Sequence, residues 1–480
     1  MPTLPRSSVV LQKTHGSKTF PLGEKLLPAP LPFKKLVGPS LILLGLGLGS
    51  GEVILWPYLV SNYGMGVIWG MIIGITMQFF LNMEIERYAL VRGESIFVGF
   101  ARMSKWLPAW FILSTFIGFG WPGIGHAGST LLSHAFGQSV SPTLISMLLF
   151  TTIGVILSVG RVVYTTVEQL LKYLIGFSVP FLVILTLWFA RPEHYVALAQ
   201  GMIGIGDGYL FLPAGIAMGV FLGALAYSGA GGNLNLSQSF YVRDKGYGMG
   251  IHADRIQSMI TNKGGSTAIS LTGNRFPLTK QQLGRFRAWW KVVNIEHAVV
   301  FWGLGLFTMM LLALLAFTTT YGLESNVEGI SFVLNEASVI GRTTLPIIGS
   351  LFLVGTGLML SGTQLTILDS TSRIITENIL LAKKKARSKA SKTYYIVLWL
   401  QIAFGMLVLS LGFDQPKELI ILGAVINAFA MFVFSGLILL LNNRYLELPL
   451  RPSAFRNIAV FLSFLILGGF SFYNLAQSVF

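Results

Sequence analysis

The sequence predicts an all-α polytopic membrane protein with eleven transmembrane helices. Of its 480 residues, 53% are hydrophobic and only 11% are charged, whereas soluble domains carry about 25% charged residues. Apolar runs of about 20 residues, the length that crosses a bilayer as a helix, recur from Leu36 to the C-terminus. The 54 glycines suit closely packed and interrupted membrane helices. Together these observations exclude a soluble globular protein.

The loops between the apolar segments predict the orientation of the chain. There are 34 Lys and Arg residues, and all but Lys172, Arg191, Arg342 and Lys417 fall in the N-terminal tail or in loops on its side of the membrane. Because Lys and Arg accumulate in cytoplasmic loops, we expect a cytoplasmic N-terminus, a C-terminus on the opposite side and a location in the plasma (inner) membrane. The predicted spans are approximately 36–61, 65–90, 107–132, 141–160, 166–190, 210–239, 293–318, 345–370, 394–413, 418–441 and 456–477.

The composition also limits the partners and the domain organisation. Residues 1–33 are polar and contain Pro, Ser and Lys, which predicts a disordered basic cytoplasmic tail before a membrane domain over 34–480. The basic loops account for the net charge of +15, so no nucleic-acid partner is expected. The absence of cysteine excludes disulfides and thiolate metal ligands. We expect no cofactor, and the sequence leaves the oligomeric state open, a monomer included.

The first span is interrupted at its centre by a polar, glycine-rich stretch. Residues 45–52 read Gly-Leu-Gly-Leu-Gly-Ser-Gly-Glu and lie between apolar residues on both sides. Glycine weakens a helix by about 1 kcal/mol relative to alanine, and a carboxylate near the bilayer centre costs about 2.5 kcal/mol or more. Non-helical backbone at this depth survives only where it lines a cavity or is buried in protein. The stretch therefore predicts a broken helix whose second half begins at Glu52.

A second break is expected in span 6, which contains the run Tyr227-Ser228-Gly229-Ala230-Gly231-Gly232. Breaks at matching positions in two halves of a chain indicate an inverted-repeat transporter with its substrate site between them. The halves would be about 36–190 and 210–441, with an extra helix at about 456–477. The alternative is two kinked helices whose glycines serve only packing. The predicted substrate-binding residues are Gly49, Ser50, Gly51, Glu52, Tyr227, Ser228 and Gly229.

The pattern around the first break resembles the Nramp (natural resistance-associated macrophage protein) divalent-metal transporters. Gly38-Pro39, the broken stretch and Tyr63-Gly64 are similar to that family's first helix, which carries an Asp-Pro-Gly-Asn motif ten residues after its Pro. The resemblance implies the LeuT-like 5+5 fold, with the motif at residues 49–52 and the Met-Pro-His motif of helix 6 at residues 227–229. It also implies a secondary transporter, working by alternating access.

This chain departs from the family at the metal ligands. The motif's Asp and Asn positions hold Gly49 and Glu52, and the Met and His positions hold Tyr227 and Gly229. A soft sulfur ligand favours transition metals, and here it is missing. Glu52 with hydroxyls and carbonyls would instead offer a hard oxygen site for a metal such as Mg²⁺ or Ca²⁺. The expected cargo is thus a metal ion or another cation.

A second resemblance keeps an alternative open. Gly49-Ser50-Gly51 followed by Pro57 is similar to the helix-1 break of the amino-acid/polyamine/organocation (APC) carriers, which share the same fold. In those proteins the amides of the break hold a substrate carboxylate. The alternative function is therefore transport of an amino acid or another small organic amine or zwitterion.

The remaining ionisable residues suggest coupling rather than catalysis. Glu52 is the first candidate for proton coupling, and His126 in span 3 is a candidate relay, although a structural hydrogen bond explains His126 equally well. Glu84, Glu86 and Glu296 fall near span ends, where we expect contact with water at the interface. The sequence shows no metal-spaced cluster, no paired carboxylates in the membrane interior and no nucleophile–base pair, so we expect no enzymatic activity.

Overall fold

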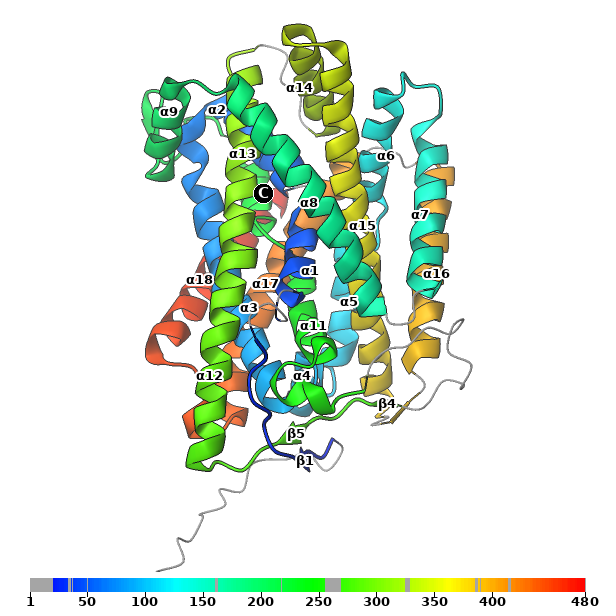
Figure 1. Cartoon of the computed structure of the whole chain (residues 1–480), viewed down its shortest axis with the longest axis vertical. Coiled ribbons are helices and arrows are strands. Elements are labelled where there is room, and N and C mark those ends of the chain that lie inside the picture. Colours follow the sequence, from blue (N-terminus) through cyan, green and yellow to red (C-terminus); the bar gives the residue numbers. More distant parts are fainter. Residues whose placement is uncertain are drawn as a thin grey trace, which may run out of the picture.

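The computed structural model describes residues 20–32, 36, 38–49, 51–159, 163–216, 218–254, 269–323, 329–384, 387–388, 390–412 and 416–479. This part of the chain forms a bundle of helices that run mostly along one axis (Figure 1). Within it, nine helices are long and apolar enough to cross a membrane, or ten if the bent pair Pro39–Gly47 and Gly51–Tyr63 is one span. The protein is therefore an integral multi-pass membrane protein.

The long helices follow the predicted spans in order, and several consist of two pieces. The continuous ones are α3 (Trp69–Arg92), α7 (Pro142–Val159), α8 (Val163–Phe189), α15 (Pro346–Ala382), α16 (Ala390–Ser410), α17 (Pro416–Tyr445) and α18 (Ala454–Val479). The two-piece helices are α1 (Pro39–Gly47) with α2 (Trp56–Tyr63), α5 (Leu107–Phe119) with α6 (Gly123–Ala135), α10 (Met218–Ala226) with α11 (Gln238–Lys245), and α12 (Lys280–His297) with α13 (Leu304–Thr320).

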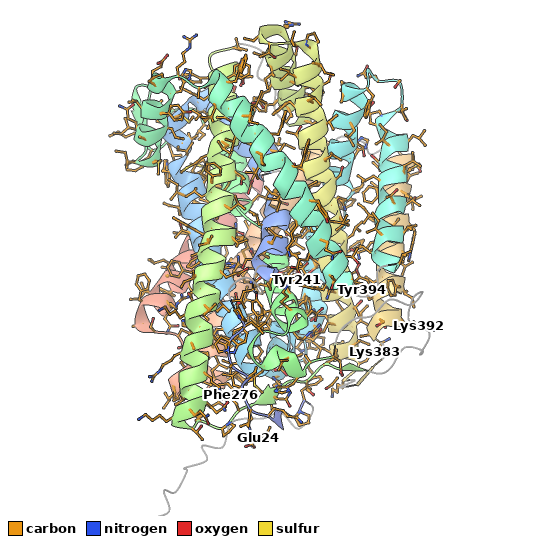
Figure 2. The ribbon with its side chains drawn as sticks, viewed as in Figure 1. Glu24, Tyr241, Phe276, Lys383, Lys392 and Tyr394 are labelled. Atoms are coloured by element: carbon orange, nitrogen blue, oxygen red, sulfur yellow. The ribbon has the colours of Figure 1, made fainter. Side chains whose placement is uncertain are left out.

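Short elements close the two ends of the bundle. At one end lie α9 (Pro192–Met202), α14 (Ile330–Thr343) and the hairpin of β2 (Ile205–Gly206) and β3 (Tyr209–Leu210). At the other end lie α4 (Ile96–Met103), the parallel pair β1 (Gly23–Glu24) and β5 (Asn274–Arg275), and the antiparallel pair β4 (Ile269–Ser270) and β6 (Arg387–Ser388). We call this second end the basic end; Figure 2 shows Glu24, Phe276, Lys383 and Lys392 there.

Two predicted span boundaries are wrong. Span 6 does not begin at residue 210, because residues 203–216 form the hairpin and a loop, and α10 starts at Met218. The helix of span 7 begins at Lys280 rather than near residue 293. Thr279 caps this helix by accepting a hydrogen bond from the backbone N–H of Gln282 at 3.3 Å. Its first turns are too polar to be recognised by hydropathy, since they lie at the basic end.

The outer surface of the bundle is apolar where lipid is expected. Large hydrophobic side chains are exposed along α7, α8, α16 and α18, for example Leu148, Ile184, Leu400 and Phe461. A water-soluble protein would not expose contiguous apolar helices of this size. The centre of the bundle is α1, whose nine residues are all buried. Its position lets the first break meet helices from the rest of the chain.

Part of the predicted disordered tail is ordered. Residues 1–19 lie outside the described part, but residues 20–32 lie against the basic end (Figure 1). Leu27 is completely buried, its N–H donates to Gln282 Oε1 at 2.7 Å, and its carbonyl accepts from Arg285 Nη1 at 2.7 Å. The prediction of disorder rested on the polar composition of this segment and overlooked two large apolar side chains, Phe20 and Leu27, that pack against the bundle.

Candidate functional site

The first break lies between α1 and a π-helical turn, Gly51–Leu55. The two helical pieces meet at 44°, and Ser50 lies outside the described residues. The carbonyl of Gly45 near the end of α1 accepts a hydrogen bond from Thr363 Oγ1 of α15 at 3.0 Å. This bond satisfies a helix-end carbonyl deep in the bundle, where an unpaired one would be costly.

The second break lies between α10 and a 3₁₀ turn, Gly232–Ser237. Gly231 and Gly232 have φ values of +72° and +47°, which side chains other than glycine rarely adopt. The helix is therefore interrupted here, with a backbone conformation that glycine at both positions allows. The two breaks touch each other, since a Cβ on Gly47 would lie 3.1 Å from the backbone of Gly229.

A small cavity lies where the two breaks meet. The volume open to the centre of a water molecule is about 10 Å³, so the cavity has room for one water or a bare ion. Among the described lining residues, Tyr227 alone carries a polar side chain, so the other polar groups are those of the backbone. The lining consists of Leu46, Gly47, Gly49, Gly51, Phe119, Ile124, Tyr227, Gly229, Ala230 and Ile367.

The cavity includes only some of the predicted site residues. Gly49, Gly51, Tyr227 and Gly229 line it. Ser228 does not: its hydroxyl donates to Ala224 O at 2.9 Å and accepts from Trp56 Nε1 at 3.0 Å. Its side chain therefore holds α10 against the second half of span 1. Residues 227–229 form a turn after the end of α10, so helical periodicity could not predict which of their side chains face the cavity.

Glu52 is buried beside the cavity but faces another helix. It is 1% exposed, and its Oε2 lies 2.9 Å from Thr308 Oγ1 of α13. The same hydroxyl lies within hydrogen-bond distance of Leu304 O and Gly305 O. Glu52 Oε1 has no partner among the described residues. The carboxyl group is thus enclosed between the first break and α13 with one oxygen unsatisfied.

His126 lies on α6, away from the cavity lining. It is 5% exposed, and its Nδ1 is 2.9 Å from Ser146 Oγ of α7. This contact joins two neighbouring helices. No group of three or more His, Asp or Glu side chains in the described part of the chain is arranged to hold a metal ion.

Three amide side chains that the sequence analysis missed stabilise the interrupted helices. Gln78 of α3 donates to Ala226 O at 3.1 Å and accepts from Gly231 N–H at 3.1 Å, so one side chain bridges the second break. Gln364 of α15 accepts from Gly125 N–H at 3.0 Å, next to a further interruption between α5 and α6. Asn427 of α17 donates to Tyr227 Oη at 2.9 Å. Isolated amides in apolar spans were the available signal.

Replacing Gln78 with leucine is expected to destabilise the second break. The substitution leaves one carbonyl and one N–H unpaired in a buried place, at a cost of about 2 kcal/mol or more in the free energy of unfolding. Thermal unfolding of the detergent-purified protein would show a lower melting temperature. Gln200→Leu on the exposed face of α9 is the control, and equal melting of the two variants would contradict the bridging role.

No family model matches the sequence, and no curated protein matches it. Solved structures do match the fold. A crystal structure of a mutant Eremococcus coleocola manganese transporter superposes with a TM-score of 0.65 at 12% identity, covering 94% of this chain and 90% of that one. Mhp1, a nucleobase-cation-symport-1 family transporter in a closed conformation with bromovinylhydantoin bound, gives a TM-score of 0.54 at 12% identity, covering 94% and 95%.

These similarities define the class of the fold. The chain has the LeuT fold shared by the manganese transporter and Mhp1, as the resemblance of its first helix predicted. At 12% identity the comparison establishes the fold, and the function has to be argued from the site.

Proposed function

We propose that the protein is a secondary transporter that moves a small cation, with a metal ion as the first candidate, by alternating access. The observation that carries this proposal is the cavity between the two breaks. It has room for about one water or a bare ion, and backbone from both breaks surrounds it. Interrupted helices that meet at the centre of the membrane form the substrate sites of transporters with this fold. The manganese transporter with the similar fold supports the same cargo class.

The proposed topology has eleven spans in two inverted five-helix repeats, with α18 as the extra helix. The two broken spans are α1 with α2, and α10 with α11. In this arrangement the basic end faces the cytoplasm, since Lys and Arg accumulate there. The C-terminus lies on the opposite side, and the plasma (inner) membrane is the proposed location. The protein performs no enzymatic reaction in this proposal.

The size of the cavity favours an ion over the organic alternative. An amino acid has several non-hydrogen atoms and does not fit a space for one water. The lining offers backbone groups and the Tyr227 hydroxyl, and oxygen ligands of this kind suit hard cations. Ser50 and Glu52 complete the proposed ligand set from the first break.

The contact between Glu52 and Thr308 suggests a proton-coupling role. Thr308 has one hydroxyl proton but three acceptors in reach, namely Glu52 Oε2, Leu304 O and Gly305 O. An ionised Glu52 takes this proton as an acceptor. A protonated Glu52 donates to Thr308 instead, which frees Thr308 to donate to its own helix. The bond between Glu52 Oε2 and Thr308 can therefore form in both protonation states, as a group that gains and loses a proton during transport requires.

Uptake of Mn²⁺, Mg²⁺ and Ca²⁺ into proteoliposomes tests the proposal. The wild-type protein is expected to accumulate at least one of these ions, and Glu52→Gln is expected to lower its uptake about tenfold or more, because a permanently neutral amide can neither bind a cation strongly nor exchange a proton. Glu193→Gln, at an exposed position of α9, should transport like the wild type. Absence of uptake of all three ions, with no effect of Glu52→Gln on any substrate, would refute cation transport.

A further inference from the structure

One face of α3 carries a buried polar row. Gln78, Asn82 and Glu86 are four residues apart, so they lie above one another on the same side of the helix, about 6 Å apart along its axis. All three are completely buried. Gln78 contacts both sides of the second break, and the row continues from there toward the basic end. Nothing in the cavity described above accounts for Asn82 or Glu86.

A second buried carboxyl group lies near the end of this row. Glu296 of α12 is completely buried, and it is close enough to Glu86 for the two carboxyl groups to interact electrostatically. Gln238 of α11 donates to Glu86 Oε2 at 3.1 Å. Ser40, at the start of α1, donates to Glu296 Oε2 at 2.5 Å. The pair therefore joins four helices, and the expectation that both carboxyls contact water at an interface was wrong.

The polar atoms around this pair are left unsatisfied. Buried polar atoms in native proteins nearly always have a hydrogen-bond partner, and buried water often supplies it. The atoms without a hydrogen-bond partner among the described residues are Asn82 Nδ2, Asn82 Oδ1, Glu86 Oε1, Gln238 Oε1, Tyr247 Oη, Glu296 Oε1 and His297 Nε2. Gln238 is directed at the pair by its own bond to Glu86, and it is completely buried.

The charged neighbours do not neutralise both carboxyl groups. Lys245 of α11 approaches from the side, but its Nζ binds both oxygens of Glu168 of α8, at 2.9 and 3.0 Å. His297 of α12 stacks between Phe79 and Phe301, with ring centroids 5.6 and 4.7 Å away. The other titratable groups near the pair are the hydroxyls of Tyr164 and Tyr247. Two ionised carboxyls in this setting repel each other, and a bound cation relieves the repulsion.

A proton suits this place better than a metal ion. The described part of the chain contains no group of three His, Asp or Glu side chains arranged for a metal. The unsatisfied atoms include donors as well as acceptors, which a bare metal would not use. Both unpaired amide atoms of Asn82 offer partners to bridging waters, and chains of titratable side chains such as Asp and Glu carry protons through transporters.

We propose that the Gln78–Asn82–Glu86 face of α3 is the route of a coupling proton between the cavity and the basic end, with Glu86 and Glu296 as its binding station. The carboxyl that receives the proton becomes neutral, and its partner stays ionised. The role in coupling rests on the proposed transport function, whereas proton binding by the pair does not.

Two measurements on the full chain separate these claims. The first is the infrared difference spectrum of the purified protein between acidic and alkaline buffer, which reports protonated carboxyl groups without any substrate. Glu86→Gln or Glu296→Gln is expected to remove one buried carboxyl signal, whereas Glu193→Gln on the exposed face of α9 should leave the buried signals unchanged. An unaltered difference spectrum in both Glu86→Gln and Glu296→Gln would overturn the binding station.

The second measurement is proton flux in proteoliposomes that contain a pH-sensitive dye, with Mn²⁺ as the probe. Glu86→Gln is expected to lower Mn²⁺-driven proton flux about tenfold or more, while Glu193→Gln keeps it. Asn82→Leu, which interrupts the row without removing a carboxyl group, should reduce the flux but leave the infrared signal. If Asn82→Leu and Glu86→Gln both carry normal proton flux, the route is wrong. Absence of Mn²⁺-driven flux in the wild type would count against the proposed function, and the infrared result would still decide the station.

Discussion

Gly51→Ala is expected to abolish transport. A Cβ at position 51 would lie 2.1 Å from the carbonyl oxygen of Tyr227, a distance that no real contact allows. The obstacle is backbone, so it cannot move aside as a side chain would, and the two breaks must separate. Overpacking of this kind costs about 1–3 kcal/mol in the free energy of unfolding, and it distorts the cavity that Gly51 and Tyr227 both line.

The measurement is metal uptake in proteoliposomes together with thermal unfolding in detergent. Gly176→Ala is the matched control, because a Cβ at that position of α8 meets nothing within 4 Å. Alanine there should even favour the helix, by about 1 kcal/mol. If Gly51→Ala transported at the rate of Gly176→Ala, the close contact of the two breaks would not exist in the working protein.

Arg373→Gln is expected to cause the largest loss of stability among these substitutions. Arg373 of α15 donates to Asp369 Oδ1 at 2.9 Å and to Asp244 Oδ2 of α11 at 2.5 Å, and all three side chains are at most 2% exposed. Tyr241 and Tyr394, which Figure 2 labels, bond to α15 beside Arg373, Tyr241 to Ser370 and Tyr394 to Asp369. Removing one partner of a buried ion pair costs about 3–5 kcal/mol.

The loss should depend on pH in a defined direction. Burial alone would raise the pKa of Asp244, which lies beyond the predicted end of span 6, but Arg243 and Arg373 outweigh burial and hold this pKa below its usual range. The stabilisation is therefore present above the ordinary pKa of an aspartate and is lost only as the pH falls through the depressed value. Without Arg373 the pKa of Asp244 is higher. As the pH falls, Asp244 is therefore protonated in the variant before it is protonated in the wild type, and the variant loses its unpaired buried charge.

Melting temperatures across a pH series test this expectation. The difference between wild type and Arg373→Gln should narrow as the buffer is made more acidic. Arg342→Gln, at an exposed position of α14, should melt like the wild type throughout. A difference that stays constant with pH would show that Asp244 does not depend on Arg373.

Some features of the site could be predicted from the sequence. The glycine runs of spans 1 and 6 predicted two interruptions, and the structure places Gly49, Gly51, Tyr227 and Gly229 around one cavity. The interruptions depend on neighbouring residues only, because glycine adopts backbone conformations that other residues disfavour. The direction of Glu52 toward α13 was not readable, since it depends on a helix more than 250 residues away in the chain.

The partners of the buried amides and carboxyls also depended on helices distant in the chain. Gln78 lay in the apolar part of its predicted span, where its partners could not be predicted. Glu86 and Glu296 lay near span ends, where their sequence neighbours predicted contact with solvent. Packing decided otherwise, because α3, α11 and α12 enclose the polar groups between them. Likewise, the sequence predicted a disordered tail over residues 20–32, whereas in the structure the backbone of Leu27 bonds to α12.

The sequence by itself determined that this chain is a membrane-embedded helical bundle and where two of its helices are interrupted, because hydropathy and backbone freedom act over a few neighbouring residues. Only the tertiary structure decided which side chains face the cavity, which carboxyls are buried together and which amides satisfy the interrupted backbone. Those outcomes depend on the rotation of each helix against partners distant in the chain, and the energy of a buried polar group depends on what those partners offer it.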